Sequence, residues 1–589
     1  MMETSDDYRG MLIKSFVIKN HKEAIVDYYP IYEQWLADDS LDPALKEELI
    51  AIRGQEEEIK DRFYQSLHFG TAGLRGKLGA GTNRMNVVTV GRATEGFARM
   101  IAEEGEEAKK KGVAIGYDVR HMSREFAHLS AEIFAAHGIR VYLHRDIVPT
   151  PVLSYTIRDL GAFAGVMVTA SHNPREYNGY KAYGTAGSQI LDDWAERIEA
   201  NIHACEADGQ ISRMSFEEGV VKGKIVLIDD GLMQRYLDKV LSLTIHDDVD
   251  KTIPFVYSPL NGCGNIPIRT VLKRRGFTGM ALVAEEIEPD PDFTTTGYPN
   301  PERPECFRLA EKKGKEVGAE LLIASDPDSD RLALEVRKPD GTYQFFNGNH
   351  IGALLTHYIV SEMAATGTLP KDGAVIKSIV TGDIARKITK KYGLVLYDVL
   401  TGFKNIAAPV NEWDTTKEHT FVFGYEESIG YNHGEFVRDK DAVSSAMLLV
   451  EAAAFYKKTQ QKMLLDVLHD IYAEYGYYGN KLISIVKEGA DGQALIGRIM
   501  ENFRAKGLVD AGNRTLVRVT DYLKDDTGLP KSNVLKYEFD DECWCAIRPS
   551  GTEPKIKLYV YSVAEQEQQA DVLCDELAEK ITAQMHAVK

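Results

Sequence analysis

Short apolar runs rich in β-branched residues alternate with segments of helical periodicity along most of the chain. The run VAIGYDVR (113–120) predicts a strand and a turn, after which Ser123 predicts a helix N-cap and Gly138 a helix end. Further β-rich runs are VYLHRD (141–146), AGVMVTA (164–170), TIPFVYSPL (252–260), LLIASD (321–326) and GAVIKSIV (373–380). This alternation predicts α/β domains with mixed or mainly parallel sheets, in which functional residues gather in loops at the carboxyl ends of strands.

The pattern differs at residues 21–60, where two helical stretches predict an N-terminal extension. A chain of 589 residues exceeds what one core supports, so we expect three or four domains. Composition shifts near 212–216, 335–340 and 475–480 mark the expected boundaries between them.

The charge balance limits the partners. The chain carries 70 basic and 89 acidic residues, a formal net charge of −19. A field of that sign repels nucleic acid and anionic membranes, so we expect neither as a partner. It also repels phosphorylated molecules, so any phosphate site must be built from a local cluster of basic groups.

The six cysteines follow no regular framework, the N-terminus lacks the pattern of a secretory signal, and no apolar run is long enough for a membrane helix. These features predict reduced thiols and a cytoplasmic location. Cys543 and Cys545 lie two apart in a strand-like segment, which fits half a metal site or ordinary burial. Without a partner pair at the spacing of a zinc site, burial is the favoured interpretation.

The first loop with candidate chemistry is ASHNP, which follows the apolar run GAFAGVMV after one threonine. It offers the hydroxyl of Ser171 and the imidazole of His172, and Lys181 follows ten residues after the serine. Ser171 is either a reactive group or a turn former and helix cap, which is a common duty of serine.

The second loop is SDPDSDR (325–331), at the end of the predicted strand LLIA. Asp326, Asp328 and Asp330 alternate, so in an extended loop their carboxylates point to one side and repel one another unless a cation neutralises them. Oxygen ligands without His or Cys favour Mg²⁺. The glycine and distal glutamate of an EF-hand are missing; the remaining alternative is a simple acidic turn, which the preceding strand and Arg331 disfavour.

The third loop, FGYEESIG (423–430), also follows a predicted strand. Glu426 and Ser428 alternate and suit the vicinal hydroxyls of a sugar, which donate and accept hydrogen bonds. Glutamates at helix starts are common, so this loop alone is a weak signal.

The fourth loop is RPSGTEPKIKLYV (548–560). Arg548 supplies a planar fork of donors, Ser550 and Thr552 supply hydroxyls, and Gly551 lets the backbone approach a ligand closely. Together they indicate a phosphate cradle, with a surface turn beside an edge strand as the alternative. The chain has no P-loop and no dinucleotide-binding glycine motif, which argues against a kinase or a dehydrogenase.

In this order the four loops closely resemble the α-D-phosphohexomutase superfamily, which comprises the phosphoglucomutases and phosphomannomutases. The resemblance spans roughly residues 65–560. It also includes FGTAGLRG (69–76), GYDVRHMS (116–123), YPNPE (298–302), NGN (347–349), TGFK (401–404) and RDKDA (438–442). The forms HFGTAGLRG, TGFK and GYEES are similar to the long phosphoglucomutase branch, which includes phosphopentomutases.

The resemblance implies an α/β fold with three similar mixed-sheet α/β domains and a smaller C-terminal α+β domain around a central cleft. The expected units are an N-terminal helical extension at 1–60, a first domain with the phosphoserine loop at 61–214, a second with the metal loop at 215–337, a third with the sugar loop at 338–477, and a fourth with the phosphate loop at 478–589.

The resemblance also implies site residues. Ser171 would carry the phosphoryl group, and its oxygen would join the Mg²⁺ ligands Asp326, Asp328 and Asp330. Basic residues of the reaction centre would be Arg75, His172, Lys181, Arg331 and Lys404. Substrate-binding residues would be Gly402, Glu426 and Ser428 for the sugar and Arg548, Ser550, Gly551 and Thr552 for the non-reacting phosphate.

The implied activity is that of an isomerase, an intramolecular phosphotransferase that interconverts α-D-glucose 1-phosphate and glucose 6-phosphate. It would use a phosphoserine, Mg²⁺ and a glucose 1,6-bisphosphate intermediate. GYEES departs from the GEMSGH-like form of many phosphomannomutases, so mannose phosphates are less expected; ribose or deoxyribose phosphates are the nearer alternative. A non-catalytic sugar-phosphate-binding scaffold is a further alternative, although a scaffold needs no phosphorylatable serine.

Three points stay open at this stage. Either His172 or Lys181 would serve as the general base. The N-terminal extension has no assigned role. The oligomeric state is the third point: we expect a monomer or a weak homodimer that binds small sugar phosphates.

Overall fold

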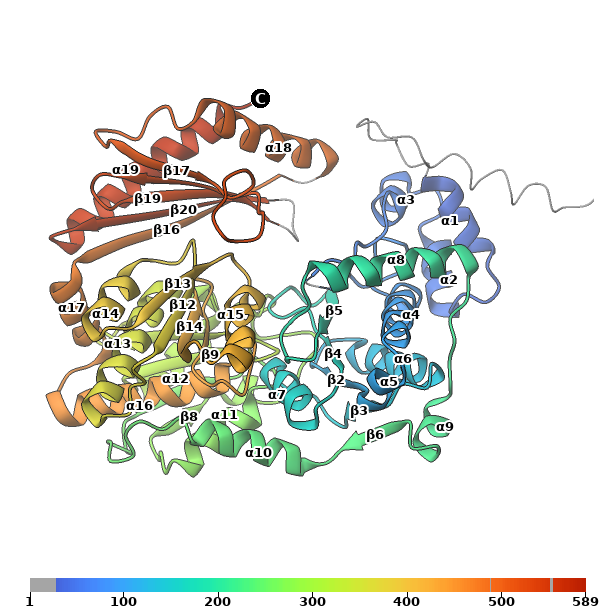
Figure 1. Ribbon diagram of the computed structural model, residues 1–589, viewed down its shortest axis with the longest axis horizontal. Helices are drawn as coiled ribbons and strands as arrows, with labels where there is room; N and C mark the ends of the chain where they lie inside the picture. The colour runs from blue at the N-terminus through green and yellow to red at the C-terminus, as the bar shows by residue number, and fades with distance from the viewer. Residues whose placement is uncertain (1–27, 72, 488, 551–554) are drawn as a thin grey trace, which may run out of the picture.

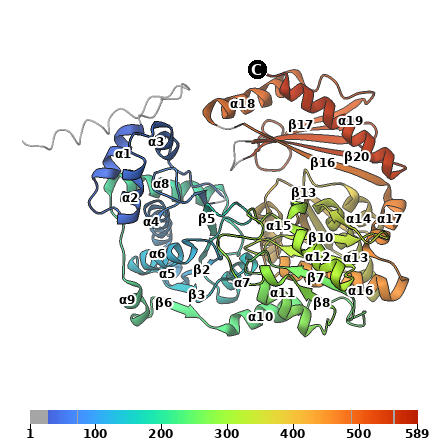
Figure 2. The ribbon, with the colours of Figure 1, turned by 180° about the vertical axis from the view of Figure 1, so that it is seen from behind.

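The computed structural model describes residues 28–71, 73–487, 489–550 and 555–589, and these residues form four β-sheets with helices around them. Figures 1 and 2 show the fourth sheet, in red, above the second and third sheets, with the first sheet beside them. In the part of the chain that the structure describes, no helix is long and apolar enough to span a membrane.

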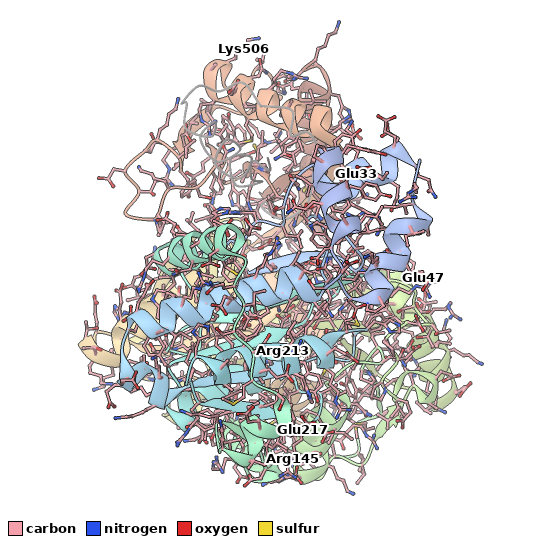
Figure 3. The ribbon with its side chains drawn as sticks, turned by 90° about the vertical axis from the view of Figure 1, so that its right-hand side faces the viewer. Glu33, Glu47, Arg145, Arg213, Glu217 and Lys506 are labelled. Atoms are coloured by element: carbon pink, nitrogen blue, oxygen red, sulfur yellow. The ribbon has the colours of Figure 1, made fainter. Side chains whose placement is uncertain are left out.

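The described part of the N-terminal extension forms a small helical cluster. Its helices are α1 (Tyr28–Ala37), α2 (Pro43–Ala51) and α3 (Glu56–Phe63). The rings of Tyr32 and Trp35 pack edge-on against Phe63, and Ala80 of the first domain completes this apolar cluster. Figure 3 shows α1 and α2, marked by Glu33 and Glu47, against the helical layer of the first sheet.

The first sheet is mixed, with the order β1-β5-β4-β2-β3-β6. Its strands are β1 (Leu74–Lys77), β2 (Val113–Tyr117), β3 (Val141–His144), β4 (Ala164–Val168), β5 (Tyr177–Tyr183) and β6 (Ile225–Ile228). Its helices are α4 (Val87–Glu103), α5 (Glu106–Lys111), α6 (Ser123–Ala136), α7 (Thr150–Leu160), α8 (Asp192–Asp208) and α9 (Phe216–Val221). β6 pairs in parallel with β3, so this sheet continues past the expected boundary at 214. Arg213 and Glu217 mark the connecting segment in Figure 3.

Ser123 is not the N-cap that its position in the sequence predicts. Met122 occupies the N-cap of α6 with φ 65°, and Ser123 is the first helical residue. The Ser123 hydroxyl donates to Asp118 Oδ1 over 2.7 Å, so a buried carboxylate competes successfully for the hydroxyl that would otherwise cap the helix.

The second sheet has the order β11-β10-β9-β7-β8 and is mixed. Its strands are β7 (Phe255–Ser258), β8 (Met280–Leu282), β9 (Leu321–Ser325), β10 (Leu332–Arg337) and β11 (Tyr343–Phe346). Around it lie α10 (Asp230–Leu241), α11 (Asn265–Arg274), α12 (Arg308–Val317) and the short 3₁₀ turns η1 (Ala284–Glu286) and η2 (Pro304–Phe307).

The third sheet has the order β13-β12-β14-β15, with an antiparallel edge strand on a parallel centre. Its strands are β12 (Gly373–Ser378), β13 (Val395–Val399), β14 (Thr420–Glu426) and β15 (Gly430–Asn432). Its helices are α13 (Gly348–Thr366), α14 (Ile384–Tyr392), α15 (Phe403–Thr416), α16 (Ala442–Gln460) and α17 (Leu464–Tyr475).

The fourth sheet is antiparallel, with the order β16-β20-β19-β18-β17. Its strands are β16 (Tyr477–Val486), β17 (Leu516–Asp521), β18 (Leu535–Phe539), β19 (Trp544–Pro549) and β20 (Lys555–Ala564), and its helices are α18 (Gly489–Lys506) and α19 (Glu567–His586). The mixed sheets and this C-terminal α+β unit confirm the predicted fold class. Cys543 and Cys545 are free and buried in its core, as the burial interpretation predicts.

The second and third sheets share one continuous apolar core, whereas the first sheet has its own. Trp544 and Tyr561 of the fourth sheet extend the shared core. The Trp544 indole also donates to Asp383 Oδ2 over 2.8 Å, which ties β19 to the third domain. The carboxyl ends of β9 and β14 and the end of β19 are thereby held in one assembly.

We expect Glu335→Gln to reduce the loss of stability that accompanies a rise in pH from 4.5 to about 8. Glu335 in β10 is only 2% exposed, and Oε2 has no hydrogen-bond partner among the described residues. Burial, followed by the Glu311 carboxylate, raises the pKa of Glu335 from 4.5 to about 8. Between these values the folded protein keeps a proton that the unfolded chain releases, so stability falls as the pH rises.

Because glutamine does not ionise, the melting temperature of the variant, measured by calorimetry from pH 5 to 9, should fall less steeply than that of the parent. Glu316→Gln, an exposed change on α12, is the control and should follow the parent. Equal slopes for Glu335→Gln and the parent would contradict this assignment.

Candidate active site

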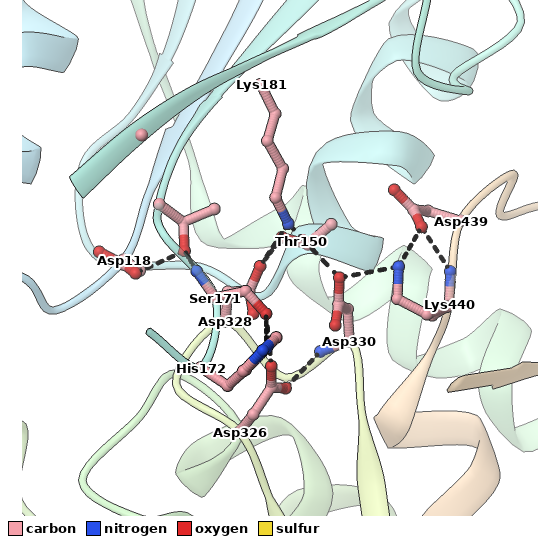
Figure 4. Close-up of polar contacts among 12 residues, drawn as sticks. Asp118, Thr150, Ser171, His172, Lys181, Asp326, Asp328, Asp330, Asp439 and Lys440 are labelled. Atoms are coloured by element: carbon pink, nitrogen blue, oxygen red, sulfur yellow. Dashed lines mark hydrogen bonds and ion pairs between the residues drawn. The ribbon is translucent and has the colours of Figure 1, made fainter. Parts of the chain in front are cut away.

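Ser171 lies at the end of β4 in a turn that leads directly into the strand β5, so it caps no helix. Its side chain is buried, and its backbone N–H donates to Thr169 Oγ1 over 2.8 Å. Ser171 Oγ donates to Asp326 Oδ2 over 2.8 Å and lies 3.1 Å from His172 Nδ1 (Figure 4). The structure therefore brings the predicted phosphoserine loop and metal loop into contact.

Asp326, Asp328 and Asp330 follow β9 and are all buried. One oxygen from each lies within 4.8 Å of the others, and this is the one group of three potential ligands that the described residues contain. Asp326 Oδ1 accepts from the backbone N–H groups of Asp330 and Arg331, whereas Oδ1 of Asp328 and Oδ1 of Asp330 have no hydrogen-bond partner among the described residues. Such hard oxygen donors suit Mg²⁺.

Neighbouring carboxylates and cations shift the acidities of this cluster in opposite directions. Burial, and then the neighbouring carboxylates of Asp328 and Asp330, raises the pKa of Asp326 well above its ordinary value. Burial also opposes ionisation of Asp328, but the ammonium group of Lys181 and the hydrogen bonds of Asp328 with Lys181, Asp326 and Thr150 together outweigh it and lower the pKa. Lys181 Nζ lies 2.8 Å from Asp328 Oδ2 and 3.4 Å from Asp330 Oδ2. A divalent cation would remove the remaining repulsion, so the residues present fit a metal ion.

Two further contacts at the cluster come from segments to which the sequence assigned no role. Lys440 Nζ lies 3.1 Å from Asp330 Oδ2 and 3.0 Å from Asp439 Oδ1 (Figure 4). Thr150 Oγ1 donates to Asp328 Oδ2 over 2.7 Å. Lys440 lies in RDKDA, one of the segments that carry the family resemblance, so the sequence could have pointed to it. No local pattern could have pointed to Thr150, because its hydrogen bond to Asp328 spans 178 residues.

Basic residues surround the phosphoserine loop. Arg75 Nη1 donates to Asn173 Oδ1 over 3.2 Å, and Arg331 Nη1 donates to Glu302 Oε2 over 3.4 Å. Burial, and then the guanidinium groups of Arg331 and Arg75, lowers the pKa of His172 well below its ordinary value. His172 is therefore neutral near pH 7, and its Nδ1 faces Ser171 Oγ.

The sugar loop and the TGFK segment meet at the end of β14. Glu426 Oε1 accepts from the backbone N–H of Gly402 over 2.6 Å, and Ser428 follows in a partly exposed turn. Lys404 instead lies 3.7 Å from Asp192 of α8, so its recorded ion pair crosses to the first domain and not to the carboxylate cluster. The structure thus brings Gly402 and Glu426 together, whereas Lys404 pairs with the first domain.

The predicted phosphate loop begins at the end of β19. Arg548 Nη1 donates to the Tyr559 hydroxyl of the neighbouring strand over 3.4 Å, and Ser550 is partly buried. Gly551 and Thr552 lie outside the described residues. A cavity of about 240 Å³ adjoins this strand; its lining includes Tyr559, Glu427 and Glu302, from the fourth, third and second domains.

Three of the loops contain a non-glycine residue with positive φ. These residues are Ser171 with φ 51°, Ser329 with φ 53° and Ile429 with φ 54°, one each in the phosphoserine, metal and sugar loops. Such conformations are rare outside glycine and persist only where surrounding contacts impose them, often at functional sites.

Comparisons with known proteins agree with this geometry. The family models of phosphoglucomutase/phosphomannomutase alpha/beta/alpha domains I, II and III match residues 66–208, 234–340 and 347–475, respectively. The chain is 35% identical to a phosphoglucomutase of Staphylococcus haemolyticus, over 85% of this chain and 90% of that protein. It is also 35% identical to a phosphoglucomutase of Staphylococcus aureus, over 86% and 92%.

Solved structures share the fold. The open form of the phosphoglucomutase pp63/parafusin from Paramecium matches with a TM-score of 0.66 at 17% identity, over 89% of this chain and 95% of that chain. A phosphoglucomutase/phosphomannomutase family protein from Burkholderia thailandensis matches with a TM-score of 0.64 at 18% identity, over 88% and 98%. The order of the loops, the domain matches and the curated relatives all indicate the same family. The chain therefore belongs to the phosphoglucomutase/phosphomannomutase family.

Proposed function

We propose that the protein is a phosphoglucomutase that interconverts α-D-glucose 1-phosphate and glucose 6-phosphate. The observation that carries the proposal is the 2.8 Å contact between Ser171 Oγ and Asp326 inside the buried carboxylate cluster. A hydroxyl at that place is positioned to carry a phosphoryl group next to a bound cation. The relatives named phosphoglucomutase support glucose phosphates as the substrates.

In the proposed reaction, phosphorylated Ser171 donates its phosphoryl group to the free hydroxyl of a bound sugar monophosphate. The bond from phosphorus to the serine oxygen breaks as the bond to the sugar oxygen forms, which yields glucose 1,6-bisphosphate. This intermediate turns end for end, and its other phosphoryl group returns to Ser171. Either end must therefore fit the same cleft.

Residues of the chain would supply the charge and the proton transfers. The phosphoserine, Asp326, Asp328 and Asp330 would hold Mg²⁺, which when bound would neutralise charge on the transferring group. The cationic side chains of Arg75, Lys181 and Arg331 would neutralise further charge on the transferring phosphoryl group. A base takes the proton of the attacking hydroxyl and an acid returns one to Ser171 Oγ; His172 and Lys181 are both candidates.

The remaining predicted residues would hold the substrate. Gly402, Glu426 and Ser428 would bind the sugar hydroxyls, and Lys404 would approach the substrate on closure of the cleft. Arg548, Ser550, Gly551 and Thr552 would grip the phosphate that does not react. We also propose a cytoplasmic enzyme that acts as a monomer or a weak homodimer.

Two measurements test the proposal. Mass spectrometry of the intact protein should show one added phosphoryl group after incubation with glucose 1,6-bisphosphate; no phosphorylation and no turnover would favour a binding scaffold. Comparison of kcat/KM on glucose 1-phosphate, mannose 1-phosphate and ribose 1-phosphate should favour glucose. A preference for ribose 1-phosphate would assign a phosphopentomutase, and a preference for mannose 1-phosphate a phosphomannomutase.

We expect Arg548→Ala to reduce kcat/KM similarly in both directions of the reaction. A bidentate arginine–phosphate contact contributes roughly 1.5–3 kcal/mol per charge-assisted bond, which corresponds to about a ten- to few-hundredfold loss. Release of the bisphosphate into the medium should rise, because the grip during its turn is weaker. Steady-state kinetics with glucose 1-phosphate and with glucose 6-phosphate measure both effects.

Arg548→Lys should restore only part of the rate, since a point charge does not reproduce the planar fork of arginine. Arg518→Ala, an exposed arginine in β17 of the same sheet, is the matched control and should leave the rates unchanged. If Arg548→Ala behaves like this control, RPSGT is an ordinary turn.

A further inference from the structure

Arg120 is a fully buried arginine beneath the phosphoserine loop, and neither the sequence nor the proposed reaction gives it a role. Its guanidinium group donates to backbone carbonyl oxygens at four positions of the segment that follows β4, namely those of Ser171, Asn173, Pro174 and Tyr177. One side chain therefore fixes four carbonyl groups of this segment, including that of Ser171 itself.

Asp118 connects this guanidinium group to the N–H side of the same turn. Its Oδ2 lies 3.3 Å from Arg120 Nε and accepts from Thr169 Oγ1 over 2.6 Å. Thr169 Oγ1 in turn accepts from the Ser171 N–H over 2.8 Å. The Asp118–Arg120 pair thus holds Ser171 through its N–H and its C=O, and buried hydrogen bonds with charged partners are the strong ones.

These contacts explain the unusual backbone of Ser171. A φ of 51° is unfavourable for serine, so it needs contacts that impose it. The conformation matters for chemistry because it directs Oγ to Asp326 Oδ2, 2.8 Å away. A donor held in one geometry is what phosphoryl transfer requires of the protein.

The second domain covers the other side of the guanidinium group. The ring of Phe293 lies over it, with 5.0 Å between the ring centroid and Arg120 Cζ. Phe293 is completely buried and is held in a tight turn, in which Gly297 N–H donates to Phe293 O over 2.7 Å. A buried cation over an aromatic face is stabilised and shielded from water.

We propose that Arg120 is a positioning residue for phosphoryl transfer, which holds Ser171 in its left-handed conformation with Oγ directed at the metal loop, and that Phe293 completes this clamp from the second domain. The inference rests on the proposed phosphoserine mechanism. With this clamp, the geometry of Ser171 in the first domain depends on the contact between Arg120 and Phe293 of the second domain.

The test is the rate constant of single-turnover phosphoryl transfer from the phosphorylated enzyme to saturating glucose 1-phosphate, measured by quenched flow. Arg120→Lys keeps the charge but loses the fork that reaches several carbonyl groups. We expect this rate constant to fall about 10- to 100-fold, the cost of a small misplacement of a reacting group. The KM for glucose 1-phosphate should change less than about threefold, because the sugar and distal phosphate are held by other domains.

This readout separates positioning from folding. A variant that merely unfolds in part would lose burst amplitude while the remaining enzyme reacts at the parent rate constant. Arg124→Lys, an exposed arginine in the first turn of α6, is the matched control and should keep both amplitude and rate constant. A rate constant for Arg120→Lys within about threefold of the parent would overturn the proposal.

Phe293→Leu tests the second half of the clamp and keeps the apolar volume. It should lower the same rate constant about three- to tenfold, since only the aromatic contact is lost. Phe277→Leu is the control: Phe277 lies under Arg275 with 5.9 Å between centroid and guanidinium carbon, in the same domain but outside the site. Equal rate constants for both phenylalanine variants would remove Phe293 from the clamp. If the parent forms no phosphoenzyme, the proposed function itself fails, which is a different outcome from a parent-like variant.

Discussion

Ser171→Ala should fold like the parent and lose nearly all mutase activity. The residue lies in a turn, and alanine removes only an oxygen, so the stability should change little. The phosphoryl carrier, however, is absent, and among the described residues no other hydroxyl donates to Asp326. A coupled assay for glucose 6-phosphate measures the loss, and a melting curve checks the fold.

Ser130→Ala is a matched control, because Ser130 is a buried serine of the same domain whose hydroxyl donates to Phe126 O within α6. It should keep its activity and accept a phosphoryl group from glucose 1,6-bisphosphate, whereas Ser171→Ala should accept none. Retention of more than about a tenth of the parent rate by Ser171→Ala, a loss of only ~1.4 kcal/mol of transition-state stabilisation, contradicts the assignment of the phosphoserine.

The loops of this site could be predicted because their signals are local. Buried strands are recognisable as short apolar runs, and polar residues at their carboxyl ends meet at one edge of a sheet. The alternation of Asp326, Asp328 and Asp330 predicted a common carboxylate cluster, and the structure gathers these residues within 4.8 Å. The resemblance to the phosphohexomutases and the fold class that it implied are confirmed by the domain matches and the sheets.

Contacts between distant segments could not be predicted from the sequence. Thr150 bonds Asp328 across 178 residues, and β6 joins the first sheet through β3, beyond a compositional boundary that suggested a domain end. The expected N-cap Ser123 was wrong for a local reason: the carboxylate of Asp118, only five residues earlier, accepts a hydrogen bond from its hydroxyl. The N-terminal extension was predicted to be helical, but its packing on Ala80 depends on tertiary structure.

Removal of divalent cations should abolish activity, and Mg²⁺ should restore it better than Ca²⁺. Three buried carboxylates lie within 4.8 Å of one another and repel, and Oδ1 of Asp328 and Oδ1 of Asp330 have no hydrogen-bond partner among the described residues, which leaves two oxygens for a cation. Ca²⁺ takes longer bonds and looser geometry than Mg²⁺, so it should hold the phosphoserine and the carboxylates less well for transfer. Protein treated with EDTA that turns over at the full rate would refute the assignment of the metal loop.

Asp328→Asn tests the same site with two readouts, the Mg²⁺ dependence of activity and that of the melting temperature. Asp328 keeps one carboxylate oxygen without a hydrogen-bond partner among the described residues, so its loss should remove a ligand and one negative charge while Lys181 and Thr150 still have an oxygen to bond. The Mg²⁺ concentration for half-maximal activity should rise at least about tenfold, equivalent to ~1.4 kcal/mol of binding free energy.

Mg²⁺ should also raise the melting temperature of the parent by mass action and raise that of Asp328→Asn less at equal concentration. Asp340→Asn, in the exposed turn between β10 and β11, should match the parent in both measurements. Identical Mg²⁺ titrations for Asp328→Asn and Asp340→Asn would place the metal elsewhere, because an aspartate that holds the ion cannot lose its charge without weakening the site.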